Sequence, residues 1–312
     1  MGHIGFSLAL KLADKNKVVG LYNKTINKER NKHLKKNNIE LIQNDLSDIN
    51  KLEKIFVKHN ITKCVYCAAV SHEIYAKEDP YKTINTNSLY VLNFLELLRS
   101  YKNIGFIYIS TGSVFQDVKD KNISIDESTV PTPKSIYAGS KRMGEIIIEN
   151  YVKYYNINSC ILRVSWVYGP PILNDTINIQ RGPIPYLLNQ LIINNKDSIT
   201  FNSGGEFEAS FTYIDDVVNA ICTLINVKVF KSIYYNLGTG ENNSNYDLAN
   251  IINEIIPSKK VSFGKNNYPW STDSVSRGPI VGVNLKKDHN FKIKYNLKNG
   301  MSKFIKIIID NA

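Results

Sequence analysis

Residues 105–113 read GFIYISTGS, and residues 135–143 read SIYAGSKRM. The first stretch is apolar, rich in β-branched and aromatic residues, and ends in small hydroxylated ones. This pattern predicts a buried strand that opens into a loop. In the second stretch Ser135 can cap a helix that follows two prolines. Strand and helix patterns alternate on both sides of this pair, so the sequence predicts an α/β fold with a parallel sheet.

The expected elements follow one another through the first half of the chain. Strands are predicted near residues 17–21, 39–43, 63–66, 105–109 and 159–162. Helices are predicted near residues 4–13, 27–36, 47–59, 81–98 and 135–155. From residue 171 onward, proline and glycine interrupt shorter elements, which indicates a change of character in the C-terminal half.

Tyr137 and Lys141 stand four residues apart, one turn on the same face of the expected helix. A neighbouring ammonium favours the phenolate, so Lys141 is expected to lower the pKa of Tyr137 below the usual value of about 10. Thr111 at the strand end, with Ser113 as a helper, could hold the same oxygen of a sugar alcohol or ketone. These residues predict proton exchange coupled to hydride transfer. The spacing alone also fits a solvated helix turn, because the chain has 19 tyrosines.

Length and composition narrow the function classes. A chain of 312 residues with 43% hydrophobic content can bury the core of one large α/β domain or of two lobes. The net charge of +11 is explained by lysines on solvated helix faces, and it could also attract anionic diphosphates. The basic residues form no stripe interleaved with aromatic ones, so nucleic acid is not an expected partner.

The four cysteines indicate neither disulfides nor a metal. Cys64 and Cys67 lie on an expected strand, where positions three apart point to opposite faces. The five histidines form no ligand cluster, and a reducing cytoplasm is the expected location. No run approaches the roughly 18 apolar residues of a membrane span, so no membrane partner is expected.

These motifs resemble the extended short-chain dehydrogenase/reductase family, whose members act on nucleotide sugars as epimerases, dehydratases and reductases. The resemblance runs almost from end to end. Beyond the Thr, Tyr and Lys set, the matching segments are residues 2–5, 18–21, 44–46, 67–69, 163–170, 211–217 and 235–240.

The resemblance implies a Rossmann-like, doubly wound parallel sheet with a smaller C-terminal substrate lobe. Residues 1–170 would form the dinucleotide-binding domain and residues 171–312 the lobe, with segments around 211–240 returning to the main domain. Gly2 and Gly5 match the second and third glycines of the phosphate loop. The first glycine and the first strand of the family pattern are missing, so we expect either a start further upstream or a partial copy.

The resemblance also implies a nicotinamide cofactor. The expected contacts are Gly2, Ile4, Gly5, Tyr22, Asn23, Lys24, Asp45, Leu46, Ala68, Ala69 and Lys141. Family members that use NAD carry a carboxylate at the end of the second strand. Here Tyr22 takes that position and Lys24 is near, so NADP is favoured over NAD unless Lys24 is simply a surface lysine.

Three reactions share this family scaffold. Dehydratases carry an acidic pair after the threonine, where this chain has Gly112 and Ser113, so dehydration is disfavoured. Residues 110–115 resemble dTDP-4-dehydrorhamnose reductases, and a 4-keto sugar reductase is therefore preferred, with a nucleotide-sugar 4-epimerase as the alternative. A protein that binds NAD(P) without catalysis, as a regulator, is the rival from another class.

The expected substrate is a nucleotide-diphosphate sugar. Many epimerases and dehydratases of the family carry a diphosphate-binding arginine where this chain has Ala209, and the reductases typically lack that arginine too. Arg277 resembles a second diphosphate arginine, and Arg181 is a weaker candidate. Asn87 matches the family's helix asparagine and is expected near the substrate. Pairing through the helix that carries Tyr137 would give a homodimer, which the sequence permits.

Overall fold

A computed structural model gives the fold of this protein. It describes residues 1–24, 26–101, 103–118, 120, 122–170, 182–267 and 277–310. Arg181 therefore lies outside the described residues. None of the helices within these ranges is both long enough and apolar enough to cross a membrane.

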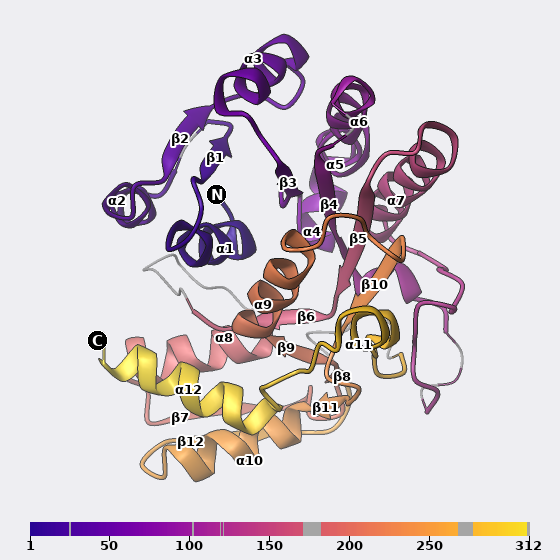
Figure 1. Ribbon diagram of the computed structural model, residues 1–312. Helices are drawn as coiled ribbons and strands as arrows, with labels where there is room; N and C mark the ends of the chain where they lie inside the picture. Colours follow the sequence, from indigo (N-terminus) through magenta and orange to yellow (C-terminus); the bar gives the residue numbers. More distant parts are fainter. Residues whose placement is uncertain are drawn as a thin grey trace.

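The described residues form helices and strands in alternation (Figure 1). The helices are α1 His3–Ala13, α2 Lys28–Lys36, α3 Ile49–His59, α4 Glu73–Glu78, α5 Pro80–Ile84, α6 Tyr90–Ser100, α7 Ile136–Tyr155, α8 Pro183–Leu188, α9 Ile214–Ile225, α10 Asn245–Ile255, α11 Val283–His289 and α12 Leu297–Asp310. The strands are β1 Val19–Tyr22, β2 Glu40–Gln43, β3 Lys63–Tyr66, β4 Gly105–Thr111, β5 Ser159–Val164, β6 Trp166–Tyr168, β7 Ser198–Phe201, β8 Glu208–Ala209, β9 Phe211–Tyr213, β10 Tyr234–Leu237, β11 Asn243–Ser244 and β12 Lys260–Phe263.

The central sheet has four parallel strands in the order β10-β5-β4-β3. Side chains of β4 alternate between two cores. Phe106 and Tyr108 pack in one core with residues of α3, α6 and α7, while Ile107 and Ile109 pack in the other with residues of α1 and α9. A sheet with both faces covered by helices requires strands that are apolar throughout, and every residue of β4 is buried. The α/β prediction is confirmed.

A second parallel pair, β1 and β2, lies apart from the central sheet. Within the described residues, β1 pairs only with β2, and β3 pairs only with β4. The facing edges of β1 and β3 border one cavity together with residues of α1. Figure 1 shows the N-terminus between these two strands. Backbone donors and acceptors along both inner edges therefore have no strand partner among the described residues.

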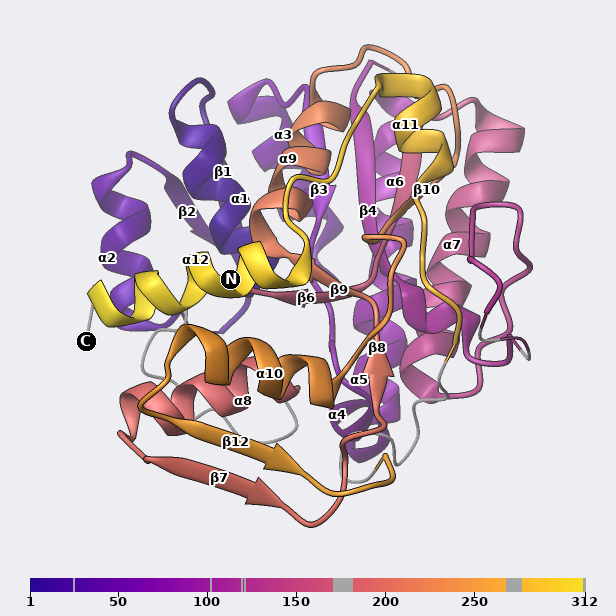
Figure 2. The same cartoon turned by 90° about the horizontal axis from the view of Figure 1, so that it is seen from below.

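The C-terminal half contributes to both parts of the molecule. Strand β10 returns to the central sheet beside β5, and α9 packs against α1. The pair β7 and β12 gathers with α8 and α10 away from the central sheet (Figure 2). The parallel pair β6 and β9 lies between these two groups, and β6 follows β5 directly along the chain.

The helix expected at residues 81–98 differs from the structure. Pro80 begins the short α5 at its first turn, and a π-helical turn, Asn85–Leu89, separates α5 from α6. Helix α4 was not predicted at all. The π-helical turn places the Asn87 side chain against Val70 and Ser140, contacts from distant parts of the chain that no local pattern encodes.

Candidate active site

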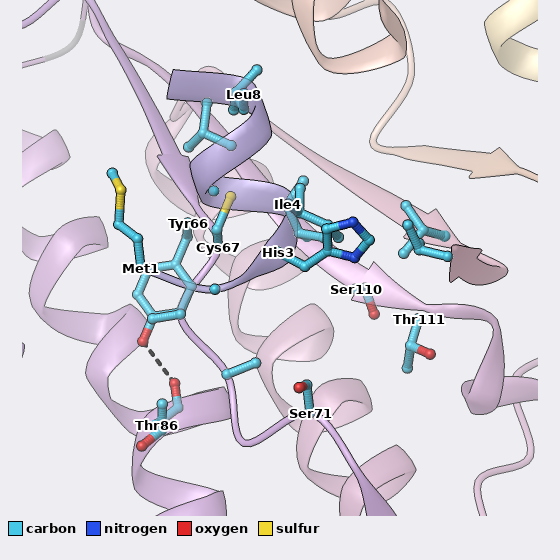
Figure 3. Close-up of a pocket in the computed structure, with 18 of the residues that line it drawn as sticks. Met1, His3, Ile4, Leu8, Tyr66, Cys67, Ser71, Thr86, Ser110 and Thr111 are labelled. Atoms are coloured by element: carbon cyan, nitrogen blue, oxygen red, sulfur yellow. Dashed lines mark hydrogen bonds between the residues drawn. The ribbon is translucent and has the colours of Figure 1, made fainter. Parts of the chain in front are cut away.

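A cleft of about 1420 Å³ runs from the gap between β1 and β3 to the carboxyl ends of β4 and β5. In Figure 3 the first residues of α1, His3 and Ile4, and the end of β4, Thr111, border the same space. Open α/β sheets bind their ligands outside the carboxyl ends of their strands. The cleft is therefore the candidate active site.

The structure brings Thr111 and Tyr137 together. Thr111 is the last residue of β4 and is 8% exposed, and its hydroxyl accepts a bond from the backbone N–H of Ser113 at 3.1 Å. Tyr137 is the second residue of α7, whose first turn is capped by Ser135 through the N–H of Ala138. Both side chains line the cleft, and the Thr111 hydroxyl lies close enough to the Tyr137 phenol to lower its pKa.

Lys141 lies one turn further along α7 and is 2% exposed. Its ammonium donates to the carbonyl of Ile109 at 2.8 Å and stands 4.6 Å from the ring centre of Tyr108. Burial lowers the pKa of Lys141 to about 8, against smaller opposing effects of Cys67 and Glu145. The ammonium is thus held at the floor of the cleft by a strand carbonyl.

The expected effect of Lys141 on Tyr137 is not found. Burial raises the pKa of Tyr137 above its ordinary value, and the hydrogen bond from Thr111 and the charge of Arg277 offset this only in part. The Lys141 ammonium is bound to the carbonyl of Ile109, and it is not among the groups that shift the pKa of the phenol. In the structure as it stands, Tyr137 is therefore a phenol that holds its proton.

A buried ion pair fixes the elements around Tyr137. Arg163 on β5 donates two bonds to Glu145 on α7, at 2.9 and 2.8 Å, and Ser110 on β4 donates a third at 2.6 Å. Glu145 is fully buried and Arg163 is 1% exposed. The sequence pattern that contains Arg163 gave no hint of this partner, which lies 18 residues away on another element.

The start of α1 fits a dinucleotide. A Cβ added to Gly2 would meet no atom within 4 Å, and no side chain caps this helix end. Backbone N–H groups at a helix N-terminus bind phosphate oxygens. Ile4, Gly5, Ala68 and Ala69 line the adjoining wall of the cleft.

Only some of the residues expected to contact the far end of the cofactor line the cleft. Tyr22, Asn23 and Leu46 line the cleft, whereas Lys24 and Asp45 do not. The Asp45 carboxylate accepts bonds from Ser47, which lower its pKa. Asn44, which lies in a matching segment but was not among the expected contacts, lines the cleft with its buried side-chain oxygen unpartnered. An unpartnered buried acceptor is a fitting contact for the donor group of a bound base.

Asn87 is buried and does not line the cleft. Its side chain bonds both backbone groups of Val70, at 2.9 and 3.1 Å, and the hydroxyl of Ser140 at 2.9 Å. The residue expected near the substrate therefore joins the loop after β3 to α7. Any effect of Asn87 on a ligand is indirect, through the position of that loop.

The structure places Arg277 beside Tyr137 in the cleft. Burial lowers the pKa of Arg277 to about 10, while the charges of Glu73 and Tyr137 act in the opposite direction. The Arg277 carbonyl accepts a bond from Asn242 at 2.6 Å, which ties this segment to the loop after β10. Glu73 also lines the cleft and was not predicted from the sequence.

The comparison with known families agrees with this geometry. Residues 1–238 match the family described as the NAD dependent epimerase/dehydratase family. The chain belongs to this family.

Two curated relatives illustrate its range. The dTDP-D-glucose 4,6-dehydratase of Dictyostelium discoideum is 30% identical over 225 residues, which are 69% of this chain and only half of that protein. A putative UDP-glucose 4-epimerase of Methanocaldococcus jannaschii is 27% identical and aligns over 99% of this chain and 96% of its own length.

Solved structures match over nearly the whole chain. The UDP-glucose 4-epimerase of Thermotoga maritima, crystallised with UDP-glucose, superposes with a TM-score of 0.85 at 22% identity, covering 99% of this chain and 96% of that one. The UDP-glucuronic acid 4-epimerase of Bacillus cereus, in complex with UDP-glucuronic acid and NAD, gives 0.81 at 22% identity, covering 100% and 97%. At this identity the likeness establishes the fold.

Proposed function

We propose that this protein is an NAD-dependent epimerase that inverts C4 of the hexose in a nucleotide-diphosphate sugar. The observation that carries the proposal is the hydroxyl pair of Thr111 and Tyr137 at the carboxyl end of β4, inside the cleft. Such a pair holds and protonates an oxygen on a carbon that gains or loses hydride. Epimerases, 4-keto reductases and 4,6-dehydratases of the family that this chain resembles share this hydroxyl pair. The residues around the pair therefore have to discriminate between these reactions.

Dehydration is disfavoured by the residues after Thr111. An acid and a base are needed there to remove water from the sugar, but Gly112 and Ser113 carry no titratable group. A Cβ at Gly112 would stand 2.2 Å from the side chain of Ile280, so a longer side chain would need that residue to move.

Epimerisation is supported over reduction by the full-length relative and by the two solved structures, all of which carry the name 4-epimerase. This reverses the preference drawn from the sequence. Reduction remains the second candidate because Ala209, at the position where many relatives carry an arginine, lines the cleft.

Each site residue has a defined part in the proposed reaction. A bound nicotinamide supplies the reversible hydride acceptor. Thr111 holds the C4 oxygen. Tyr137, once it has lost its own proton, takes the proton of that oxygen as the ketone forms, and the resulting phenol returns the proton after the ketone has rotated. The charge of Arg277 favours the phenolate that this step needs, against the effect of burial. Lys141 holds a positive charge beneath this centre, and burial makes that charge easy to lose above a pH of about 8. Arg277 is the candidate cation for the diphosphate.

NAD is proposed in preference to NADP. The case for NADP depended on Lys24, which does not line the cleft. Asn23 lines the cleft, and its side-chain amide donates to Asp45 at 3.3 Å. This bond brings a carboxylate close to the position at which it would repel a 2′-phosphate. The neighbour from Bacillus cereus was crystallised with NAD.

The test is incubation with NAD and UDP-glucose or UDP-glucuronate, with chromatography of the products. An epimerase interconverts the C4 isomers without net consumption of cofactor. Stoichiometric oxidation of NAD(P)H with a 4-keto sugar, without isomerisation, would establish the reductase instead. Cofactor binding without turnover of any nucleotide sugar would contradict both and favour a regulatory protein.

A further inference from the structure

Asn44 places a buried side-chain amide at the carboxyl ends of β1 and β2. It is the first residue after β2, and its backbone N–H donates to the carbonyl of Tyr22, the last residue of β1, at 2.9 Å. Asn44 is 2% exposed and lines the cleft, as Tyr22 does. The strand pair therefore fixes this amide at the end of the cleft where the far end of the cofactor is expected.

One end of the amide is already used within the protein. The side-chain NH₂ group of Asn44 donates to the carbonyl of Asp45 at 2.8 Å. Reversing the amide would set its oxygen against that carbonyl oxygen, so the orientation is fixed. The side-chain oxygen is buried and has no hydrogen-bond partner among the described residues. Because nearly all buried acceptors in folded proteins are paired, this oxygen indicates a donor group on a ligand.

The neighbouring carboxylate does not compete for this role. Asp45 is exposed and does not line the cleft, and its two oxygens accept bonds from Ser47, at 2.9 and 2.7 Å, and from Asn23 at 3.3 Å. Leu46 lines the cleft, but its side chain is apolar. Of these three consecutive residues, Asn44 is therefore the one that both lines the cleft and carries a side-chain acceptor.

Resting on the proposed function, we propose that Asn44 is a specificity-determining residue that reads the base of the dinucleotide. Its side-chain oxygen accepts a hydrogen bond from an amino group on a purine ring, such as adenine carries. Hypoxanthine has a carbonyl oxygen in place of that amino group, so two acceptors would face each other without a proton between them. A site built around a buried polar group rejects a ligand that leaves that group unpaired. The ligand class is therefore a dinucleotide with an amino-substituted purine base.

The experiment measures the dissociation constants of NAD and of nicotinamide hypoxanthine dinucleotide by calorimetry. The two molecules differ only at one edge of the purine ring, so the ratio of their affinities isolates the base contact. The wild-type protein is expected to bind NAD at least about tenfold more tightly. Asn44→Leu keeps a side chain of similar size without an acceptor, and it is expected to bring the ratio within about threefold of one by weakening NAD binding.

Asn16→Leu is the matched control. Asn16 also lines the cleft and also donates its amide to a backbone carbonyl, that of Leu12 at 3.0 Å, but it is exposed. This variant should leave the affinity ratio unchanged. Asp45→Ala should leave the ratio unchanged too, because the Asp45 side chain does not line the cleft.

A merely structural role of Asn44 would weaken the binding of both dinucleotides alike. Equal affinities in the wild-type protein, a measurement that needs no variant, or a ratio unmoved by Asn44→Leu would overturn the inference and leave the epimerase proposal standing. A ratio lost in Asp45→Ala but kept in Asn44→Leu would return the base contact to Asp45 and overturn the inference as well. Failure of the wild-type protein to bind either dinucleotide would overturn both proposals.

Discussion

At the scale of single residues, the environment of the site decides its chemistry more than its spacing does. The sequence correctly places Thr111, Tyr137 and Lys141 near one another, because a strand end and a helix start leave few arrangements. It wrongly assigns the cause of the phenol's pKa. That pKa depends on burial and on Glu73 and Arg277, which lie far away in the chain and enter the site only through the fold.

Buried Lys141 should cost stability in exchange for function. Its pKa is about 8 in the folded protein against an ordinary 10.5, so the unfolded state binds more protons between these values and stability rises with pH across this window. Lys141→Met should therefore be ~1–3 kcal/mol more stable than wild type below pH 8, with the gain lost by pH 10.5, and inactive. Urea unfolding at several pH values measures this. A variant less stable than wild type at pH 7 would contradict the account.

At the scale of elements, a helix or strand can be predicted from the sequence when the residues that determine it lie within that element. Strand β4 and helix α7 were predicted because an apolar run, two prolines and a capping serine are all in their own sequence. Helix α4 and the π-helical turn were not, since side-chain contacts such as Asn87 with Ser140 span 53 residues. The cleft wall that carries Glu73 belongs to this second kind.

The Arg163–Glu145 pair should hold β5 and α7 in register. Glu145→Met leaves Arg163 buried without its carboxylate and should lower the free energy of unfolding by about 3–5 kcal/mol. The double variant with Arg163→Met should recover much of this loss, since no fully buried charge is then left unpaired and Arg142, the other partner of Glu145, keeps Glu149 at 3.8 Å. Glu149→Met, at a more exposed position of the same helix, is the control and should cost under about 1 kcal/mol. Equal losses in the single and double variants would show that charge is not the cause.

At the scale of the whole molecule, the gap between β1 and β3 is the feature that sets this structure apart from a continuous doubly wound sheet. Both inner edges border the cleft, and the Met1 side chain reaches Gly20 of β1. An apolar strand of about six residues fused ahead of Met1 should pair with both edges and raise stability by a few kcal/mol, at about 0.5–1.5 kcal/mol for each hydrogen bond.

The matched control for this fusion is the same segment with alternate residues replaced by proline, which cannot donate to either edge. Thermal unfolding of the two fusions and the unmodified chain measures the effect. Equal midpoints for all three would mean that the gap accepts no strand.

The central claim is that Tyr137 exchanges a proton with the oxygen on C4 of a bound sugar. Turnover and cofactor binding of Tyr137→Phe test it most directly, with Tyr154→Phe, an exposed tyrosine of the same helix, as the control. The account predicts that Tyr137→Phe loses about 10²–10⁴-fold in kcat while cofactor affinity stays unchanged, and that Tyr154→Phe behaves as wild type. Turnover by Tyr137→Phe within about threefold of wild type would contradict it.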